Sequence, residues 1–159
     1  MTDRRWETHV RRVSEAAATM PSFAVASAWE PVAPGELLTR LRDPVPVWRD
    51  GALERPALRI AVALPGPVFP VLGDYAALRE RDPGSFTAAE LAGATFTVWG
   101  LDLAVDWLTP PLLPRQGAGL GVGREGLTLV CDARAVAPET AAALLSSATG
   151  RSGSDRRPG

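Results

Sequence analysis

The stretch that decides the fold is residues 93–123, GATFTVWGLDLAVDWLTPPLLPRQGAGLGVG. Its first part, 94–101 (ATFTVWGL), is rich in β-branched and aromatic residues and predicts a strand. The proline-rich PPLLP that follows predicts a loop. Its last part, 117–123 (GAGLGVG), has a glycine at every second position, so one face of a strand there would carry no side chains. We therefore expect another backbone segment to approach that strand closely.

The same glycines raise the alternative of a dinucleotide-binding loop. Their offsets differ from those of a G-x-G-x-x-G fingerprint, and no helix is predicted directly after them. Close packing of backbone against the glycine face is therefore the favoured interpretation.

Downstream, the sequence predicts a hairpin and a final helix. Residues 127–132 (LTLVCD) form the second strand of the hairpin, with a turn around Glu125 and Gly126. Pro138 and Glu139 begin the helix, because proline is favoured at the first helical position. One side of this helix is apolar and consists of Ala141, Leu144, Leu145 and Ala148.

Upstream, two helices flank a strand. Residues 3–20 predict a helix whose inward face would consist of Trp6, Val10, Val13, Ala17 and Met20. Residues 23–29 (FAVASAW) predict a strand. A second helix begins at Pro34, with Leu37, Leu38 and Leu41 facing inward.

The middle of the chain predicts shorter elements. Residues 43–57 contain three prolines and are interpreted as an irregular connection. Strands are expected at 58–64 and 68–72, and a short helix at 75–81. Thr87 and Glu90 have the spacing of a capping box for one helical turn. The whole pattern predicts an α+β fold for residues 1–149, with a disordered tail at 150–159.

Composition limits the functions that the chain can perform. The 159 residues are 46% hydrophobic and 22% charged, with a formal net charge of −1, which is typical of a globular domain. A nucleic-acid partner is not expected, because phosphate binding needs clustered positive charge. No apolar run is long enough to span a membrane, and residues 1–20 are too charged for a signal peptide, so we expect a cytoplasmic protein.

Three residue types that commonly perform catalysis are nearly absent. His9 is the only histidine and is interpreted as a solvated helix residue; Cys131 is the only cysteine and is interpreted as a buried thiol in a strand. All 17 basic residues are arginines, so lysine Schiff-base chemistry is excluded. Neither a metal site nor a bound cofactor is expected.

The blocks above, in this order, resemble the catalytic domain of the dihydrolipoamide acyltransferases of 2-oxo acid dehydrogenase complexes. That family reads roughly Gly-Gly-Thr-Phe-Thr-(Ile/Val)-Ser-Asn-Leu-Gly, then Pro-Pro-Gln-Ala-(Ile/Ala)-Leu-Gly-Val-Gly, which resembles residues 93–123. Its closing segment contains Asp-His-Arg-Val-Val-Asp-Gly and resembles 127–145 (LTLVCDARAVAPETAAALL). Residues 59–74 (RIAVALPGPVFPVLGD) and the opening of the chain are also similar to the family.

The resemblance implies a reduced chloramphenicol-acetyltransferase-like fold, that of the coenzyme A-dependent acyltransferases, with helices packed on a mixed sheet. It also implies a homotrimer with sites between subunits. Compared with the family, we expect this chain to be shortened, without the long helix between residue 43 and residue 58 and without the lipoyl and subunit-binding domains.

The resemblance further implies that the acyl-transfer residues are lost. The family's histidine, which deprotonates the attacking thiol, corresponds to Ala133, and its oxyanion-donating serine corresponds to Trp99. The Asp/Asn that supports the histidine loop corresponds to Ala137, and the motif glycine to Pro138. The aspartate and arginine of the motif remain as Asp132 and Arg134.

Trp99 has two interpretations. Either it fills a core, or it shapes an apolar pocket for another ligand, with the smaller Ala133 and Ala137 offsetting its volume. In the second case any polar chemistry would depend on Asp102, Asp132, Arg134 or Glu139. With the two substituted positions, the candidate pocket consists of Trp99, Asp102, Asp132, Ala133, Arg134 and Glu139.

Three functions remain open from the sequence. The first is a divergent acyltransferase homologue that binds or remodels another small molecule, in bacterial secondary metabolism for example. The second is a non-catalytic trimeric scaffold that docks with a partner. The third is an acyltransferase that uses a carboxylate or the substrate itself as the base.

Overall fold

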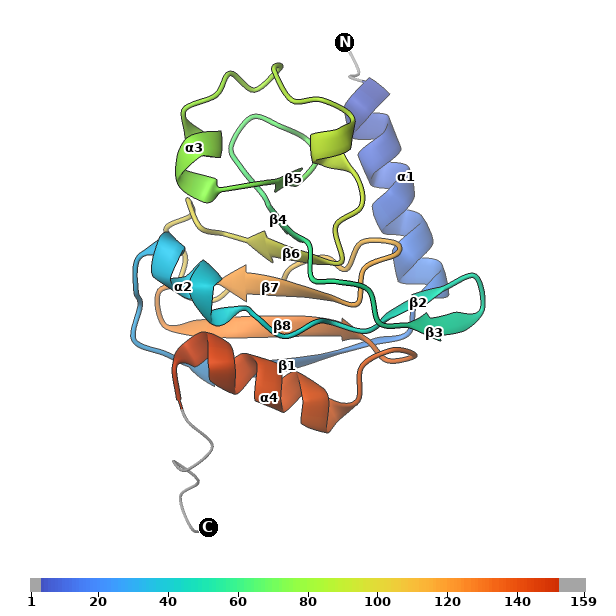
Figure 1. Ribbon diagram of the computed structural model, residues 1–159, viewed down its shortest axis with the longest axis vertical. Helices are drawn as coiled ribbons and strands as arrows, with labels where there is room; N and C mark the ends of the chain where they lie inside the picture. The colour runs from blue at the N-terminus through green and yellow to red at the C-terminus, as the bar shows by residue number, and fades with distance from the viewer. Residues whose placement is uncertain (1–3, 152–159) are drawn as a thin grey trace.

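A mixed six-stranded sheet in the order β1-β8-β7-β6-β4-β5 organises residues 4–151, the part of the chain that the computed structural model describes (Figure 1). Its strands are β1 (Ser22–Ala28), β4 (Ile60–Val62), β5 (Val71–Leu72), β6 (Phe96–Trp99), β7 (Ala118–Val122) and β8 (Gly126–Asp132). Strands β4, β6 and β7 are parallel, and the other neighbours pair antiparallel. The predicted α+β fold with a mixed sheet is confirmed.

One face of the sheet carries the main hydrophobic core. Helices α2 (Pro34–Arg40) and α4 (Pro138–Thr149) contact each other on this side, and α4 packs on β1 and β8 (Figure 1). The inward positions predicted for the last helix are confirmed, because Ala141, Leu145 and Ala148 are buried. The core face of the strands is made by alternate residues, including Val98, Leu120 and Leu129.

The opposite face of the sheet, which we call the second face, is covered partly by backbone. An added Cβ atom at Gly121 would lie 1.9 Å from the carbonyl oxygen of Leu108, and one at Gly123 would lie 2.1 Å from that of Asp106. The segment at 105–111 is held there by backbone hydrogen bonds, such as that from the Arg124 nitrogen to the Val105 oxygen (2.7 Å). The predicted close approach to the glycine strand is therefore confirmed.

Residues 43–57 are more ordered than the sequence analysis predicted. They contain a hairpin of β2 (Val47–Arg49) and β3 (Ala52–Glu54). Its turn residues, Asp50 and Gly51, both have positive φ angles (51° and 78°). Asp-Gly favours this kind of two-residue turn, which explains why the hairpin forms despite the prolines. The absence of a long helix in this segment is confirmed.

The first helix, α1 (Arg4–Thr19), forms as predicted, but its predicted inward face is wrong. Among its residues only Ala16 is buried, while Trp6 is 53% exposed and Val10 45% exposed. The helix stands at the side of the sheet, so most of its apolar stripe has no cover within the described chain (Figure 1).

The remaining elements are short. Helix α3 (Tyr75–Arg79) follows β5, and the 3₁₀ turn η1 (Ala89–Leu91) is closed by the predicted capping box, in which the Glu90 nitrogen donates to Thr87 Oγ1 (3.3 Å). Gly150 ends α4 with a φ of 77°. Most of the predicted disordered tail, residues 152–159, lies outside the described residues. Within residues 4–151, no helix combines the length and the apolar character needed to cross a membrane.

Candidate functional site

Strand β6 presents two side chains, Thr97 and Trp99, on the second face. Its other two residues, Phe96 and Val98, belong to the main core, because successive strand residues alternate between faces. Thr97 is fully buried, and its Oγ1 donates a hydrogen bond to Oε1 of Gln116 (2.6 Å). Thr97 thereby joins β6 to Gln116, which lies two residues before the start of β7.

The indole of Trp99 lies over the glycine strand. An added Cβ atom at Gly119 would be 3.5 Å from Trp99 Nε1 and 3.0 Å from the carbonyl oxygen of Pro111. Trp99 is half-buried, and within residues 4–151 its buried Nε1 has no hydrogen-bond partner. A buried N–H without an acceptor is unfavourable, so this position carries an unused polar group.

Asp102 lies three residues beyond Trp99 and is held by helix α3. The Tyr75 hydroxyl donates to Asp102 Oδ1 (2.5 Å), and Arg79 Nε lies 3.5 Å from the same oxygen. Burial, and then the hydrogen bond to Asp102, raise the pKa of Tyr75 to about 12. The phenol is therefore neutral at physiological pH and cannot act as a base. The other carboxylate oxygen, Oδ2, is buried without a partner among the described residues.

The remaining candidate residues lie at and after the end of β8, around an ion pair between the buried Asp132 and the exposed Arg134. Asp132 is fully buried and accepts hydrogen bonds from the Arg134 guanidinium, to Oδ1 from Nε (3.0 Å) and to Oδ2 from Nη2 (2.9 Å). Arg134 also lies 5.9 Å from the ring centroid of Trp48. Ala133 is exposed, and its backbone nitrogen donates to Pro21 (2.8 Å).

Near this ion pair, Ala137 is the residue before helix α4. Glu139 is exposed in the first turn of that helix.

The six residues of the predicted pocket do not come together in one chain. Trp99 pairs with Gly121, which pairs with Thr128, whereas Asp132 lies four residues farther along β8, roughly 13 Å away along the strand. Trp99 and Asp102 thus lie at one end of the strands, and the group around Asp132 at the other. Within a single chain, the small Ala133 and Ala137 cannot offset the volume of Trp99.

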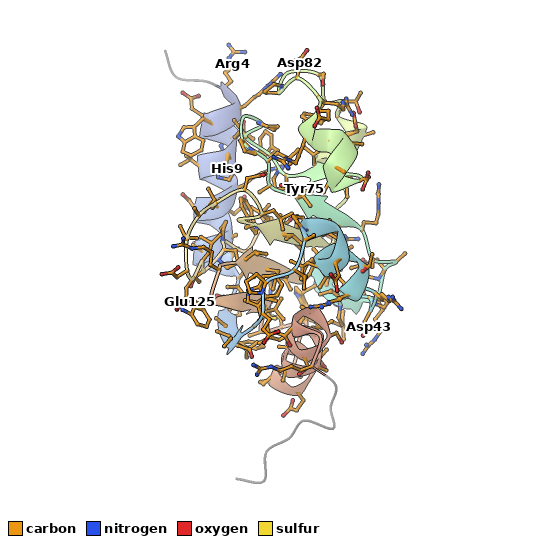
Figure 2. All side chains as sticks on the ribbon, turned by 90° about the vertical axis from the view of Figure 1, so that its left-hand side faces the viewer. Arg4, His9, Asp43, Tyr75, Asp82 and Glu125 are labelled. Carbon is orange, nitrogen blue, oxygen red and sulfur yellow. The ribbon has the colours of Figure 1, made fainter. Side chains whose placement is uncertain are left out.

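Asp132 and Cys131 are poor candidates for the base of an acyl transfer. Both oxygens of Asp132 are occupied by Arg134. Cys131 is buried, as predicted, and burial together with the Asp132 charge raises its pKa to about 12, so the thiol stays protonated. His9 is on α1, where its ring lies 6.3 Å from that of Phe69 (Figure 2). The prediction of a solvated His9 is wrong in part, because the side chain is half-buried.

A cavity of about 530 Å³ lies between α1 and the second face, the face of the sheet to which Thr97 and Trp99 of β6 belong. Its wall includes Gln116, the hydrogen-bond partner of Thr97, and Thr97 is two residues, or roughly 6–7 Å, from Trp99 along β6. The charged lining residues are Arg12, Glu15, Arg49 and Arg115, with His9 beside them.

Sequence reasoning missed this cavity. Its arginines come from α1, from the unpredicted β2 and from the loop before β7, and no local motif connects them. Only a correct prediction of the Asp50-Gly51 hairpin would have placed Arg49 on an ordered strand.

The fold matches solved structures of acyltransferase cores. The cubic core of a pyruvate dehydrogenase multienzyme complex has a TM-score of 0.82 at 16% identity, with 94% of this chain and 88% of that chain covered. The Azotobacter vinelandii dihydrolipoamide acetyltransferase has a TM-score of 0.77 at 16% identity and the same coverage. In that protein a serine, a histidine and an asparagine were investigated for their role in the catalytic mechanism.

A third match is a truncated catalytic core of the 2-oxoacid dehydrogenase complex from Thermoplasma acidophilum, with a TM-score of 0.73 at 15% identity and 94% of each chain covered. At these identities the likeness shows the fold, which is that of dihydrolipoamide acyltransferase catalytic domains. No family model and no curated protein sequence matches this chain.

Proposed function

We propose that this protein is a homologue of the dihydrolipoamide acyltransferase catalytic domain that does not transfer acyl groups and works by binding a small molecule. The observation that carries the proposal is Trp99, which occupies on β6 the position that the sequence resemblance assigns to the oxyanion-donating serine. A hydroxyl donor is thereby replaced by a bulky indole that lies over Gly119.

The loss of two chemical groups supports the first half of the proposal. Removing an oxyanion donor typically lowers the rate by about 10²–10³, and removing a general base by about 10²–10⁴. The position assigned to the base is Ala133, and the neighbouring carboxylate of Asp132 accepts hydrogen bonds from Arg134 on both oxygens. A carboxylate held in this way is a poor substitute base, which disfavours a surviving transferase.

The cavity beside β6 supports the second half. A volume of about 530 Å³ is within the usual range for small-molecule sites, which is about 300–1,000 Å³. It lies on the same face of the sheet as Trp99, which supports a binding site next to the position that the resemblance assigns to acyl transfer. The proposal keeps the cytoplasmic location that the sequence predicts.

Acetyl transfer tests the first half. The purified chain is incubated with acetyl-coenzyme A and dihydrolipoamide, and the acetylated product is measured against an active acetyltransferase domain as the positive control. We expect no product above the uncatalysed rate. A rate well above background that disappears in Asp102→Asn or Glu139→Gln would overturn the proposal in favour of a carboxylate-based transferase.

A neutral fluorescent probe tests the second half. 1-Aminoanthracene should bind saturably and gain fluorescence, and Ala92→Trp, which places an indole in the cavity wall, should reduce its affinity. Ala76→Trp is the matched control, because Ala76 is exposed on α3 and does not line the cavity. Absence of saturable binding, or equal affinity in both variants, would contradict binding at this site.

A second candidate function, a homo-oligomeric scaffold, is favoured by the surface of α1. Trp6 and Val10 are one helical turn apart, and both are about half exposed. An apolar stripe of this kind is commonly covered by another subunit. The trimer implied by the resemblance is compatible with either function.

A further inference from the structure

The charged residues that line the 530 Å³ cavity are mainly of one sign. Arg12 comes from α1, Arg49 from β2, and Arg115 from the loop before β7, while Glu15 is the acidic residue of the lining. His9 does not add to the positive charge at neutral pH, because burial and the nearby Arg12 lower its pKa below the ordinary 6.5. Three guanidinium groups against one carboxylate favour an anionic ligand.

Arg49 has a side-chain donor without an acceptor among the residues that the structure describes. Its Nη1 lies 3.6 Å from Glu54, and its Nη2 donates to the carbonyl oxygen of Arg115 (3.4 Å). The Arg49 side chain is 19% exposed, and its Nε is buried and has no acceptor among residues 4–151. A buried cationic N–H without a partner is unfavourable, and an anionic oxygen from a ligand would relieve it.

Arg115 is held beside Arg49 by an unusual backbone conformation. Its φ of 66° is in the left-handed region, which non-glycine residues seldom adopt and which is often found at functional sites. Arg115 provides the carbonyl that receives Arg49, and its own guanidinium is largely exposed, 4.0 Å from Asp50. This weak surface pair leaves the Arg115 guanidinium available to a ligand.

Apart from His9 and Gln116, the rest of the lining is apolar. Phe69 contacts Arg12, whose guanidinium carbon is 5.4 Å from the ring centroid, and the edge of His9. Leucines and prolines complete this side, including Leu72, Leu91 and Leu113. An inorganic anion would leave these residues uncovered, whereas a carboxylate attached to a ring or acyl chain would contact both parts of the lining.

We propose that this cavity binds an organic carboxylic acid, with its carboxylate on Arg49 and Arg115 and its apolar body against Phe69. This inference rests on the proposed function, that the chain works by binding a small molecule, and it specifies the site and the chemical class of the ligand. The amide group of Gln116, whose oxygen is occupied by Thr97, provides a further donor at the inner wall.

Calorimetry with a matched pair of probes tests the proposal. 1-Naphthoate and its neutral isostere 1-naphthamide have the same ring system and differ in charge. We expect 1-naphthoate to bind at least about tenfold more tightly, because the carboxylate gains charge-assisted hydrogen bonds that the amide lacks. Equal affinity for the two probes, or no binding of 1-naphthoate, would overturn it.

Substitutions of single arginines test which residues bind the carboxylate. Arg115→Gln should weaken 1-naphthoate binding about tenfold and leave 1-naphthamide unchanged, and Arg49→Gln should do the same if circular dichroism shows it folded. Arg55→Gln is the control, an exposed arginine outside the cavity lining. Unchanged 1-naphthoate affinity in Arg115→Gln would overturn the assignment, and tighter binding of phenyl phosphate than of 1-naphthoate would replace the carboxylate by a phosphate.

The outcomes separate this inference from the proposed function. Saturable binding of 1-naphthamide and 1-aminoanthracene with no preference for 1-naphthoate would leave the small-molecule function intact and contradict the carboxylate. Acetyl transfer to dihydrolipoamide would contradict the proposed function whatever the probes do.

Discussion

At the scale of single residues, the hydrogen bond between Tyr75 and Asp102 joins α3 to the turn that follows β6. The pair can be measured directly, because Tyr75 is the only tyrosine in the chain. Its absorbance change near 295 nm on ionisation therefore reports this one group.

We predict that Tyr75 ionises near pH 12 in the folded protein. Asp102→Asn should lower the pKa of Tyr75, because it removes a negative charge that disfavours the phenolate. Arg79→Gln should raise that pKa, because the Arg79 charge favours the phenolate. A rapid pH jump with absorbance detection measures ionisation before alkaline unfolding. A wild-type pKa near 10 would contradict the buried pair.

The same proton linkage affects stability at high pH. The folded protein holds the Tyr75 proton more tightly than the unfolded chain, whose tyrosine has the ordinary pKa of 10.0. The resulting contribution to the free energy of unfolding is fully present below pH 10 and is lost as the pH rises toward about 12.

His9 gives a second single-residue prediction. As the only histidine, it gives one imidazole signal in an NMR titration, and we expect its pKa to lie below 6.5. Because the folded pKa is lowered, the unfolded chain binds the proton more readily, so the free energy of unfolding should fall as the pH drops below about 6.5. Arg12→Gln should raise the His9 pKa, whereas Arg11→Gln, an exposed control on the same helix, should change it less. No difference between the two variants would contradict the contribution of Arg12.

The sequence could predict single residues only where local pattern determines them. Cys131 was correctly predicted to be buried because it lies in an apolar strand. The candidate pocket stays a prediction. Its members share their place in the family's motifs, and one chain alone does not bring all six together. Motifs do not tell at which end of a sheet each residue lies, and Asp132 and Trp99 are at opposite ends.

At the scale of secondary-structure elements, the sequence predicts correctly that backbone packs against the alternating glycines of β7. Period-two spacing puts them on one face, and their missing side chains allow the segment at 105–111 to lie against that face. The sequence analysis does not predict the hairpin at Asp50 and Gly51, because the three prolines of residues 43–57 indicate an irregular connection, whereas the Asp-Gly pair favours a two-residue turn.

The sequence correctly predicts that α1 is a helix with an apolar stripe. Its burial could not follow from the pattern, because periodicity identifies an apolar face but not the surface that covers it.

We predict that Gly121→Ala destabilises the protein by at least about 1–3 kcal/mol, because the new methyl group would overlap the Leu108 carbonyl oxygen and backbone would have to move. Gly35→Ala is the matched control. It lies in α2 with no atom near the added methyl group, so it should be neutral or stabilise by about 0.4–1 kcal/mol. Urea unfolding of both variants measures the difference, and similar midpoints would show that the 105–111 segment does not press on β7.

At the scale of the whole molecule, the open question is how many copies assemble. We predict a trimer, with a mass by light scattering three times the 16.8 kDa of one chain. The exposed Trp6 and Val10 mark α1 as part of the contact, so Val10→Glu should shift the mass toward that of the monomer. Ala18→Glu is a control on the same helix, also at an exposed position.

A monomer at micromolar concentration, with or without the substitution, would contradict the predicted assembly. It would also remove the main support for the scaffold function, while leaving the cavity and its ligand unaffected.

The pairing of β1 with β8 has a consequence for how the protein is made. Among residues 4–151, β1 pairs within the sheet only with β8, with Ser22 opposite Asp132, so residues 29–132 must be synthesised before its partner strand is complete. At rates of synthesis of about 5–20 residues per second, the nascent β1 stays unpaired for roughly 5–20 s. Formation of the six-stranded sheet therefore follows the synthesis of β8, and chains truncated before residue 126 should be substrates for chaperones and proteases.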